Sequence, residues 1–237
     1  MRSSSHYRNK FRAVLAALSG LMPLLLLAPS PVKAQASHPV SGRQYAHVMG
    51  VGGADWLVRP EREMEENPDL AVSLLGLKAG MAVADIGAGV GYYSLRFAAK
   101  VGASGKVYAT DLQPGMLRLL RQRLEKEKVR NVEPVLGSET EANLPDQSID
   151  MAVLVDVYHE FSEPRQMLAS IRRALKPDGR LVLLEFRKED PKVPIREEHK
   201  MTVAVAKQEL AADGFTLDKL VTDLPWQHIL FFKKTAE

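Results

Sequence analysis

Short runs of Val, Leu, Ile and Ala alternate along most of the chain with stretches in which apolar residues recur every three or four positions. The short runs are typical of strands buried on both faces, and the recurrence is typical of amphipathic helices. Strands are expected at residues 81–85, 106–111, 132–136, 149–156 and 180–185. Helices are expected at 92–101, 114–128 and 164–175, the last closed by a turn at 176–179, and a further helix begins at Asn67-Pro68.

This alternation predicts an α/β fold with a doubly wound, Rossmann-like sheet of mostly parallel strands. After a helix at 202–212, two strands at 215–223 and 228–233 follow each other with only a few residues around Pro225 between them. Because so short a link cannot form a parallel crossover, the last strand is expected to run antiparallel. The sequence therefore predicts a seven-stranded sheet with an antiparallel last strand.

The first 36 of the 237 residues have the pattern of a secretory signal peptide. A basic stretch precedes an apolar run, Ala13 to Ala28, and Ala34-Gln35-Ala36 offers small residues for cleavage. We expect an exported protein, periplasmic or secreted, with an N-terminal extension at 37–66 and one domain at 67–237. An uncleaved membrane anchor and a cytoplasmic protein that starts at Met49 stay open as alternatives.

The charge balance changes when the leader is set apart. The whole chain has 32 basic and 29 acidic residues, but five of the basic residues lie in 1–36, which leaves 27 against 29. A slightly acidic remainder argues against a nucleic-acid partner, and membrane contact is expected only through an uncleaved leader. The absence of cysteine excludes thiolate metal sites and cysteine nucleophiles.

A glycine-rich segment, Asp85-Ile86-Gly87-Ala88-Gly89-Val90-Gly91, stands between the first strand and the next helix. Glycines there let a ligand approach the backbone closely, but Tyr92 occupies the third glycine position of the dinucleotide fingerprint. Asp85 would repel a pyrophosphate and attract an ammonium or sulfonium group. Asp111 ends the second strand, where a carboxylate can accept ribose hydroxyls. The pattern therefore favours a cationic nucleoside.

These motifs resemble those of the class I S-adenosylmethionine-dependent methyltransferases, over roughly residues 67–234. Segments 144–150 and 175–181 resemble sequence motifs of the small-molecule methyltransferases related to quinone biosynthesis. One departure is Gly137-Ser138, where those methyltransferases frequently have Gly-Asp. The resemblance implies that S-adenosylmethionine is the cofactor, with its methionine part at Asp85 and the glycines and its ribose at Asp111. The expected cofactor site comprises Asp85, Gly87, Ala88, Gly89, Gly91, Asp111, Leu112, Ser138, Glu139 and Asp156.

Candidate catalytic residues follow the later strands, because ligands bind beyond the carboxyl ends of parallel strands. His159, Glu185 and His228 are expected there, with His199 as a fourth candidate. His159 is favoured as the base that takes the acceptor's proton, although each histidine is equally well explained as a structural residue. No close spacing such as His-Glu-x-x-His occurs, so no metal site is predicted.

Four apolar residues of the N-terminal extension are expected either to form a lid over an apolar acceptor or simply to cover the sheet edge. They are Tyr45, Met49, Trp56 and Met64. The favoured function is methyl transfer from S-adenosylmethionine to a small molecule. A non-catalytic exported protein that binds this nucleoside and an NAD(P)-dependent oxidoreductase are the alternatives.

Overall fold

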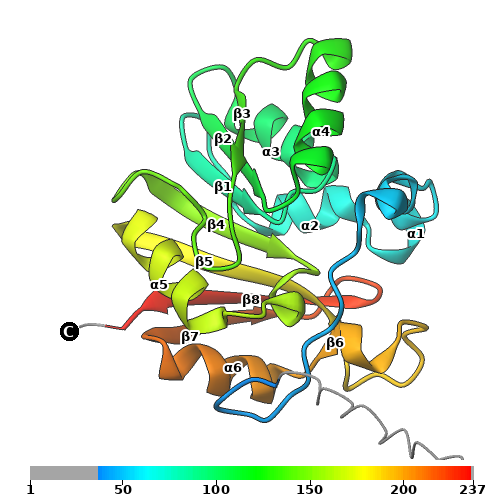
Figure 1. Ribbon diagram of the computed structural model, residues 1–237, viewed down its shortest axis with the longest axis vertical. Coiled ribbons are helices and arrows are strands. Elements are labelled where there is room, and N and C mark those ends of the chain that lie inside the picture. Colours follow the sequence, from blue (N-terminus) through cyan, green and yellow to red (C-terminus); the bar gives the residue numbers. More distant parts are fainter. Residues whose placement is uncertain (1–36, 236–237) are drawn as a thin grey trace, which may run out of the picture. The chain divides into compact units, whose positions relative to one another are not determined.

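The short apolar runs form the strands of one sheet in the computed structural model, which describes residues 37–235 (Figure 1). Within these residues the strand order is β3-β2-β1-β4-β5-β8-β7, and the two-residue β6 pairs with β5 off this path. The strands are β1 (Ala82–Ile86), β2 (Lys106–Asp111), β3 (Val132–Leu136), β4 (Ile149–Val155), β5 (Leu175–Arg187), β6 (Lys200–Met201), β7 (Phe215–Val221) and β8 (Gln227–Lys234).

Helices cover both faces of this sheet. Apolar side chains of α2, α3 and α4 pack in one core cluster, and those of α5 and α6 pack in a second cluster against the other face. The α-helices are α1 (Arg62–Glu65), α2 (Pro68–Leu74), α3 (Tyr92–Val101), α4 (Pro114–Glu127), α5 (Pro164–Ala174) and α6 (Val203–Ala212). The 3-10 helices are η1 (Val51–Val58), η2 (Tyr158–Glu160) and η3 (Glu197–His199). The predicted doubly wound fold is confirmed.

The direction of the last strand is also confirmed. β8 runs antiparallel to both of its neighbours, β5 and β7, whereas β1 to β5 pair in parallel. The sequence predicts seven strands, and the described residues add an eighth, β6, which pairs with β5 through only two residue pairs. Two residues are too few to leave an apolar run in the sequence.

The entry to β5 differs from the prediction. The segment 176–179 does not form a turn ahead of the strand, because β5 already begins at Leu175, which pairs with Ile149. The next pair joins Met151 to Arg180, so the Lys-Pro-Asp-Gly segment is accommodated as a bulge within a continuous strand. Proline and glycine are compatible with a bulge because the ladder is interrupted there.

The N-terminal extension leads into the sheet through α2. Asn67 caps this helix as predicted, with its side chain accepting a hydrogen bond from the Leu70 backbone N–H, and Pro68 occupies the first position. The predicted signal peptide, residues 1–36, lies outside the described residues. None of the helices described is long and apolar enough to cross a membrane.

Candidate active site

A cavity of about 1050 Å³ opens beyond the carboxyl ends of β1, β2 and β4. This is where the strand order reverses, because β2 and β3 lie on one side of β1 and β4 and β5 lie on the other. Such a switch point is the usual ligand site of an open α/β sheet, and the volume is large enough for a nucleoside together with a second small molecule.

The glycine loop forms one wall of the cavity. Gly87, Ala88 and Gly89 line it, and the backbone N–H groups of Gly87 and Ala88 donate to the Thr110 carbonyl. Gly87 has a φ of +72°, and a Cβ at this position would lie 2.6 Å from a methyl carbon of Val157. The loop therefore needs glycine for its conformation and for its close approach to the loop after β4. Gly91 does not line the cavity; it is the left-handed N-cap of α3.

Asp111 holds the glycine loop from the end of β2. Its Oδ2 accepts a hydrogen bond of 2.8 Å from the Gly89 N–H, and its Oδ1 accepts one of 2.8 Å from the Gln113 N–H. Burial raises the pKa of Asp111, and these two hydrogen bonds oppose that shift. A carboxylate in this position both orders the loop and faces the cavity.

Asp85 and Asp156 place two more carboxyl groups at the cavity wall. The pKa of Asp85 is raised to about 7, chiefly because the carboxyl is buried, and the hydrogen bond from the Ser94 hydroxyl opposes this shift. Asp156 has a φ of +53°, and its Oδ2 accepts a hydrogen bond of 2.6 Å from the Gln227 side-chain amide. Burial also raises the pKa of Asp156 well above its ordinary value. Its buried Oδ1 has no hydrogen-bond partner among the described residues.

The remaining predicted cofactor residues lie at the ends of β2 and β3. Leu112, Ser138 and Glu139 all line the cavity. The Ser138 hydroxyl accepts backbone N–H groups from within its own loop, and Glu139 accepts a hydrogen bond of 3.1 Å from the Ser162 hydroxyl. These residues are within reach of a ligand at this edge, but their individual contacts to it stay predictions.

His159 and Glu185 form a buried pair. His159 Nδ1 lies 2.6 Å from Glu185 Oε2, and the second oxygen of Glu185 accepts a hydrogen bond of 3.0 Å from the Tyr158 N–H. Burial lowers the pKa of His159, but the charge and hydrogen bond of Glu185 outweigh it, so the pKa is raised. His159 lines the cavity, whereas Glu185 lies behind it. Glu185 therefore positions the imidazole ring.

The two other predicted histidines differ in their surroundings. His199 lines the cavity, and its Nδ1 lies 3.1 Å from His159 Nε2. His228 stands opposite Glu185 in the register of β5 and β8 but does not line the cavity, and neither of its ring nitrogens has a hydrogen-bond partner among the described residues. Burial lowers the pKa of His228. The geometry places His228 too deep in the core to contact a ligand in the cavity.

The N-terminal extension covers part of the cavity. Tyr45, Met49 and Trp56 line it, but Met64 does not, because this residue is 80% exposed to solvent. The extension is fixed by Arg43, whose guanidinium donates to the His159 carbonyl at 2.9 Å and pairs with Glu209 of α6 at 3.0 Å. The predicted lid thus contributes three of its four residues to the cavity.

The cavity wall also contains a buried ion pair that the sequence does not predict. Arg62 and Glu66 form two hydrogen bonds of 2.6 and 2.7 Å, and the Arg62 guanidinium carbon lies 4.2 Å from the centre of the Tyr92 ring. An Arg and a Glu four residues apart are typical of an exposed helix, so the sequence gives no signal that this pair is buried.

The part of the chain that forms much of the cavity is similar to known proteins. Residues 83–179 match a family described as "Methyltransferase domain". The ubiquinone/menaquinone biosynthesis C-methyltransferase UbiE of Marinomonas sp. is 34% identical over 118 residues, which are 49% of this chain and 47% of that protein. UbiE of Escherichia fergusonii is 34% identical over 114 residues, 48% and 45% of the two chains. The chain thus spans about half the length of these curated relatives.

Solved structures share the arrangement of strands and helices. A SAM-dependent methyltransferase from Aquifex aeolicus superposes with a TM-score of 0.74 at 27% identity, over 78% of this chain and 98% of that one. The PH0226 protein from Pyrococcus horikoshii has a TM-score of 0.61 at 18% identity, over 76% and 93% of the two chains. The second likeness concerns the fold alone.

Proposed function

We propose that this protein transfers a methyl group from S-adenosylmethionine to a small-molecule acceptor. Two similarities support this proposal. Residues 83–179 match a methyltransferase domain, and the fold matches that of a SAM-dependent methyltransferase. The observation that carries the proposal is the glycine loop held by Asp111 at the switch point of the sheet, beside a cavity that continues past His159. One end of the cavity can hold the cofactor, and the other can hold the acceptor.

The residues at the carboxyl ends of β1, β2 and β4 fit this cofactor. The free Oδ1 of Asp156 and the carboxyl of Asp85 offer acceptors and negative charge to an ammonium group. Asp111 and Leu112 would lie along the ribose, and Ser138 and Glu139 would lie near the base. When bound, S-adenosylmethionine supplies a methyl group on a positively charged sulfur.

His159 promotes loss of the acceptor's proton. A hydroxyl, amine or acidic carbon must lose a proton when it is methylated, and an oriented imidazole within reach of the acceptor speeds such steps. Glu185 holds Nδ1 of His159 and so directs Nε2 toward His199 and the cavity. Replacement of His159 by Gln should slow turnover while cofactor affinity stays the same; unchanged turnover would contradict this role.

The acceptor is apolar or aromatic. The part of the cavity around His159 is lined by Tyr45, Phe161, Phe186 and Ile195, which favour such a molecule. The similarity over about half the length of C-methyltransferases of ubiquinone/menaquinone biosynthesis supports the same class of acceptor.

The chain is exported, on the strength of the leader pattern in residues 1–36. Expression with the native leader, followed by fractionation and N-terminal sequencing, tests this. Mature protein that begins at Ser37 outside the cytoplasm is the expected result, and uncleaved protein in the cytoplasm would contradict it. Export raises the question of cofactor supply, because the methyl donor would have to reach the same compartment.

The central experiment uses S-adenosylmethionine labelled in its methyl group. The purified protein is incubated with it and with small-molecule, protein and nucleic-acid fractions of a cell extract. Label in an extractable small molecule is expected. Label only in protein or nucleic acid would contradict the acceptor class, and cofactor binding without any transfer would favour a binding protein.

A further inference from the structure

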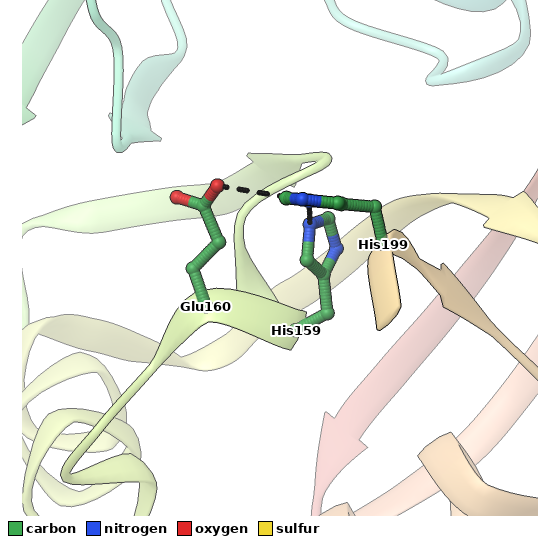
Figure 2. Close-up of side chains that lie close together, drawn as sticks. All are labelled: His159, Glu160 and His199. Atoms are coloured by element: carbon green, nitrogen blue, oxygen red, sulfur yellow. Dashed lines mark hydrogen bonds and ion pairs between the residues drawn. The ribbon is translucent and has the colours of Figure 1, made fainter. Parts of the chain in front are cut away.

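Three side chains that can bind a metal ion meet at the acceptor end of the cavity (Figure 2). His159 and Glu160 come from η2, directly after β4, and His199 comes from η3. His159 Nε2 lies 3.1 Å from His199 Nδ1, and His199 Nδ1 lies 4.0 Å from Glu160 Oε1. One ligand atom from each residue lies within 4.8 Å of the other two. Because His199 is 40 residues from His159, no local spacing in the sequence reveals the group.

The distances suit a bound ion. Metal bonds of roughly 2.0–2.2 Å to imidazole nitrogen and carboxylate oxygen place neighbouring ligand atoms about 3 to 3.5 Å apart. The two imidazole nitrogens are already at 3.1 Å, and Glu160 Oε1, which lies 4.0 Å from His199 Nδ1, must move closer when the ion binds. Two imidazoles and one carboxylate form a ligand set used for zinc and for other divalent transition metals.

Neighbouring residues fix the orientation of the ligand side chains by hydrogen bonds, as is common at metal sites. Glu185 engages Nδ1 of His159 at 2.6 Å, which leaves Nε2 directed toward His199. A carboxylate behind a ligating histidine fixes the ring orientation and makes the ring a better ligand. The Glu160 carboxylate in turn accepts a hydrogen bond from the Met49 backbone N–H.

The charge around the group favours a cation. Glu160 and Glu185 contribute two carboxyl groups, and no Lys or Arg among the described residues forms an ion pair with either. Of the two guanidinium groups close to the cluster, that of Arg43 donates to the backbone carbonyl of His159 and pairs with Glu209, and that of Arg196, the N-cap of η3, also lines the cavity.

We propose that His159, Glu160 and His199 bind one divalent transition-metal ion of the zinc class, with a free coordination position that faces the cavity. Three protein ligands with an open position are the arrangement of catalytic rather than structural zinc sites. The open position takes an oxygen atom, from water or from a hydroxyl of the acceptor. An oxygen bound in this way gives up its proton to solvent more easily, and His159, whose Nε2 is then a metal ligand, acts through the ion and not as the base itself. This last step rests on the proposed function, whereas metal binding does not.

Cobalt(II) titration of untagged, chelator-treated full-length protein tests the site directly. Visible absorption reports coordination by nitrogen and oxygen ligands, and metal analysis after dialysis against zinc gives the stoichiometry. We expect one ion per chain, an affinity reduced at least tenfold in both His199→Gln and Glu160→Gln, and a reduction of about 10- to 100-fold in Glu185→Gln.

His47→Gln is the matched control, because His47 lines the cavity outside the cluster. This variant should bind cobalt as the unaltered protein does. If His199→Gln does not fold, the cobalt affinity of Glu160→Gln, compared with that of the unaltered protein, provides the test. Absence of stoichiometric binding, or binding that neither ligand variant weakens, overturns the proposal.

Cofactor titration separates this proposal from the proposed function. S-adenosylmethionine should bind equally well to His199→Gln and to the unaltered protein, because the side chain of His199 contacts His159 and Glu160 and not the glycine loop. Methyl transfer at full rate by the chelator-treated protein would overturn the role of the ion and leave His159 itself as the base. If the unaltered protein does not bind S-adenosylmethionine, the proposed function is contradicted, but the result of the metal titration is unaffected.

Discussion

Replacement of Gly87 by Ala tests how the glycine loop is built. Gly87 has a φ of +72°, and an added Cβ would lie 2.6 and 2.7 Å from the two methyl carbons of Val157. A non-glycine residue at such a φ costs about 1–2 kcal/mol. Crowding in a packed environment adds about 1–3 kcal/mol. The variant should therefore lose about 2–5 kcal/mol of unfolding free energy.

Gly76→Ala provides the matched control. Gly76 has nearly the same φ, +70°, but nothing lies within 4 Å of a Cβ added there. Only the conformational cost of about 1–2 kcal/mol should appear in this variant. The difference between the two variants isolates the contact with Val157.

The same contact should affect ligand binding. Relief of the overlap moves the Gly87 backbone by roughly the difference between 2.6 Å and an ordinary contact of 3.4 Å, and so displaces the neighbouring cavity-lining residues Ala88 and Gly89. Cofactor affinity should fall about tenfold or more in Gly87→Ala, equivalent to about 1.4 kcal/mol, and should not change in Gly76→Ala. Urea unfolding and calorimetry measure the two quantities. Equal unfolding free energies in the two variants, together with unchanged affinity, would refute the reasoning.

Three further predictions concern the carboxyl groups. Asp111→Ala removes the acceptor of the Gly89 N–H, so cofactor affinity by calorimetry should fall about tenfold or more; unchanged affinity would show that the loop is held without it. Glu185→Gln releases the His159 ring, so turnover should fall about tenfold or more with cofactor affinity retained, and a parallel loss of both would argue against a positioning role. Because the pKa of Asp85 is about 7, the carboxyl is largely neutral below that pH and charged above it. Affinity for S-adenosylmethionine should rise as the pH increases through about 7, and Asp85→Asn should flatten the profile; an equal slope in the variant would contradict the assignment.

The sheet could be predicted because its strands are short apolar runs separated by polar helix starts and glycine turns. The helix 92–101 and the strand 106–111 have the predicted bounds. The entry to β5 could not be predicted in this way, since Lys-Pro-Asp-Gly is a normal turn sequence and only its pairing with β4 turns it into a bulge. β6 is too short to leave a pattern.

Residues of the cavity wall could be predicted from the sequence where they lie at the carboxyl ends of strands. Asp85, Asp111 and Asp156 all line the cavity because the carboxyl ends of β1, β2 and β4 meet there. Residues that reach the cavity from other segments could not be placed there from the sequence. Arg62 reaches the wall from α1. Glu160 meets His199, which lies beyond α5 and β5 in the chain, and neither position shows a local sequence signal.

Calorimetry of the purified protein with S-adenosylmethionine, S-adenosylhomocysteine and NAD tests the central claim most directly. The glycine loop, Asp85 and Asp111 predict binding of S-adenosylmethionine and S-adenosylhomocysteine at one site per chain, and no binding of NAD. Binding of NAD without binding of either adenosyl compound would contradict the assignment of this cavity.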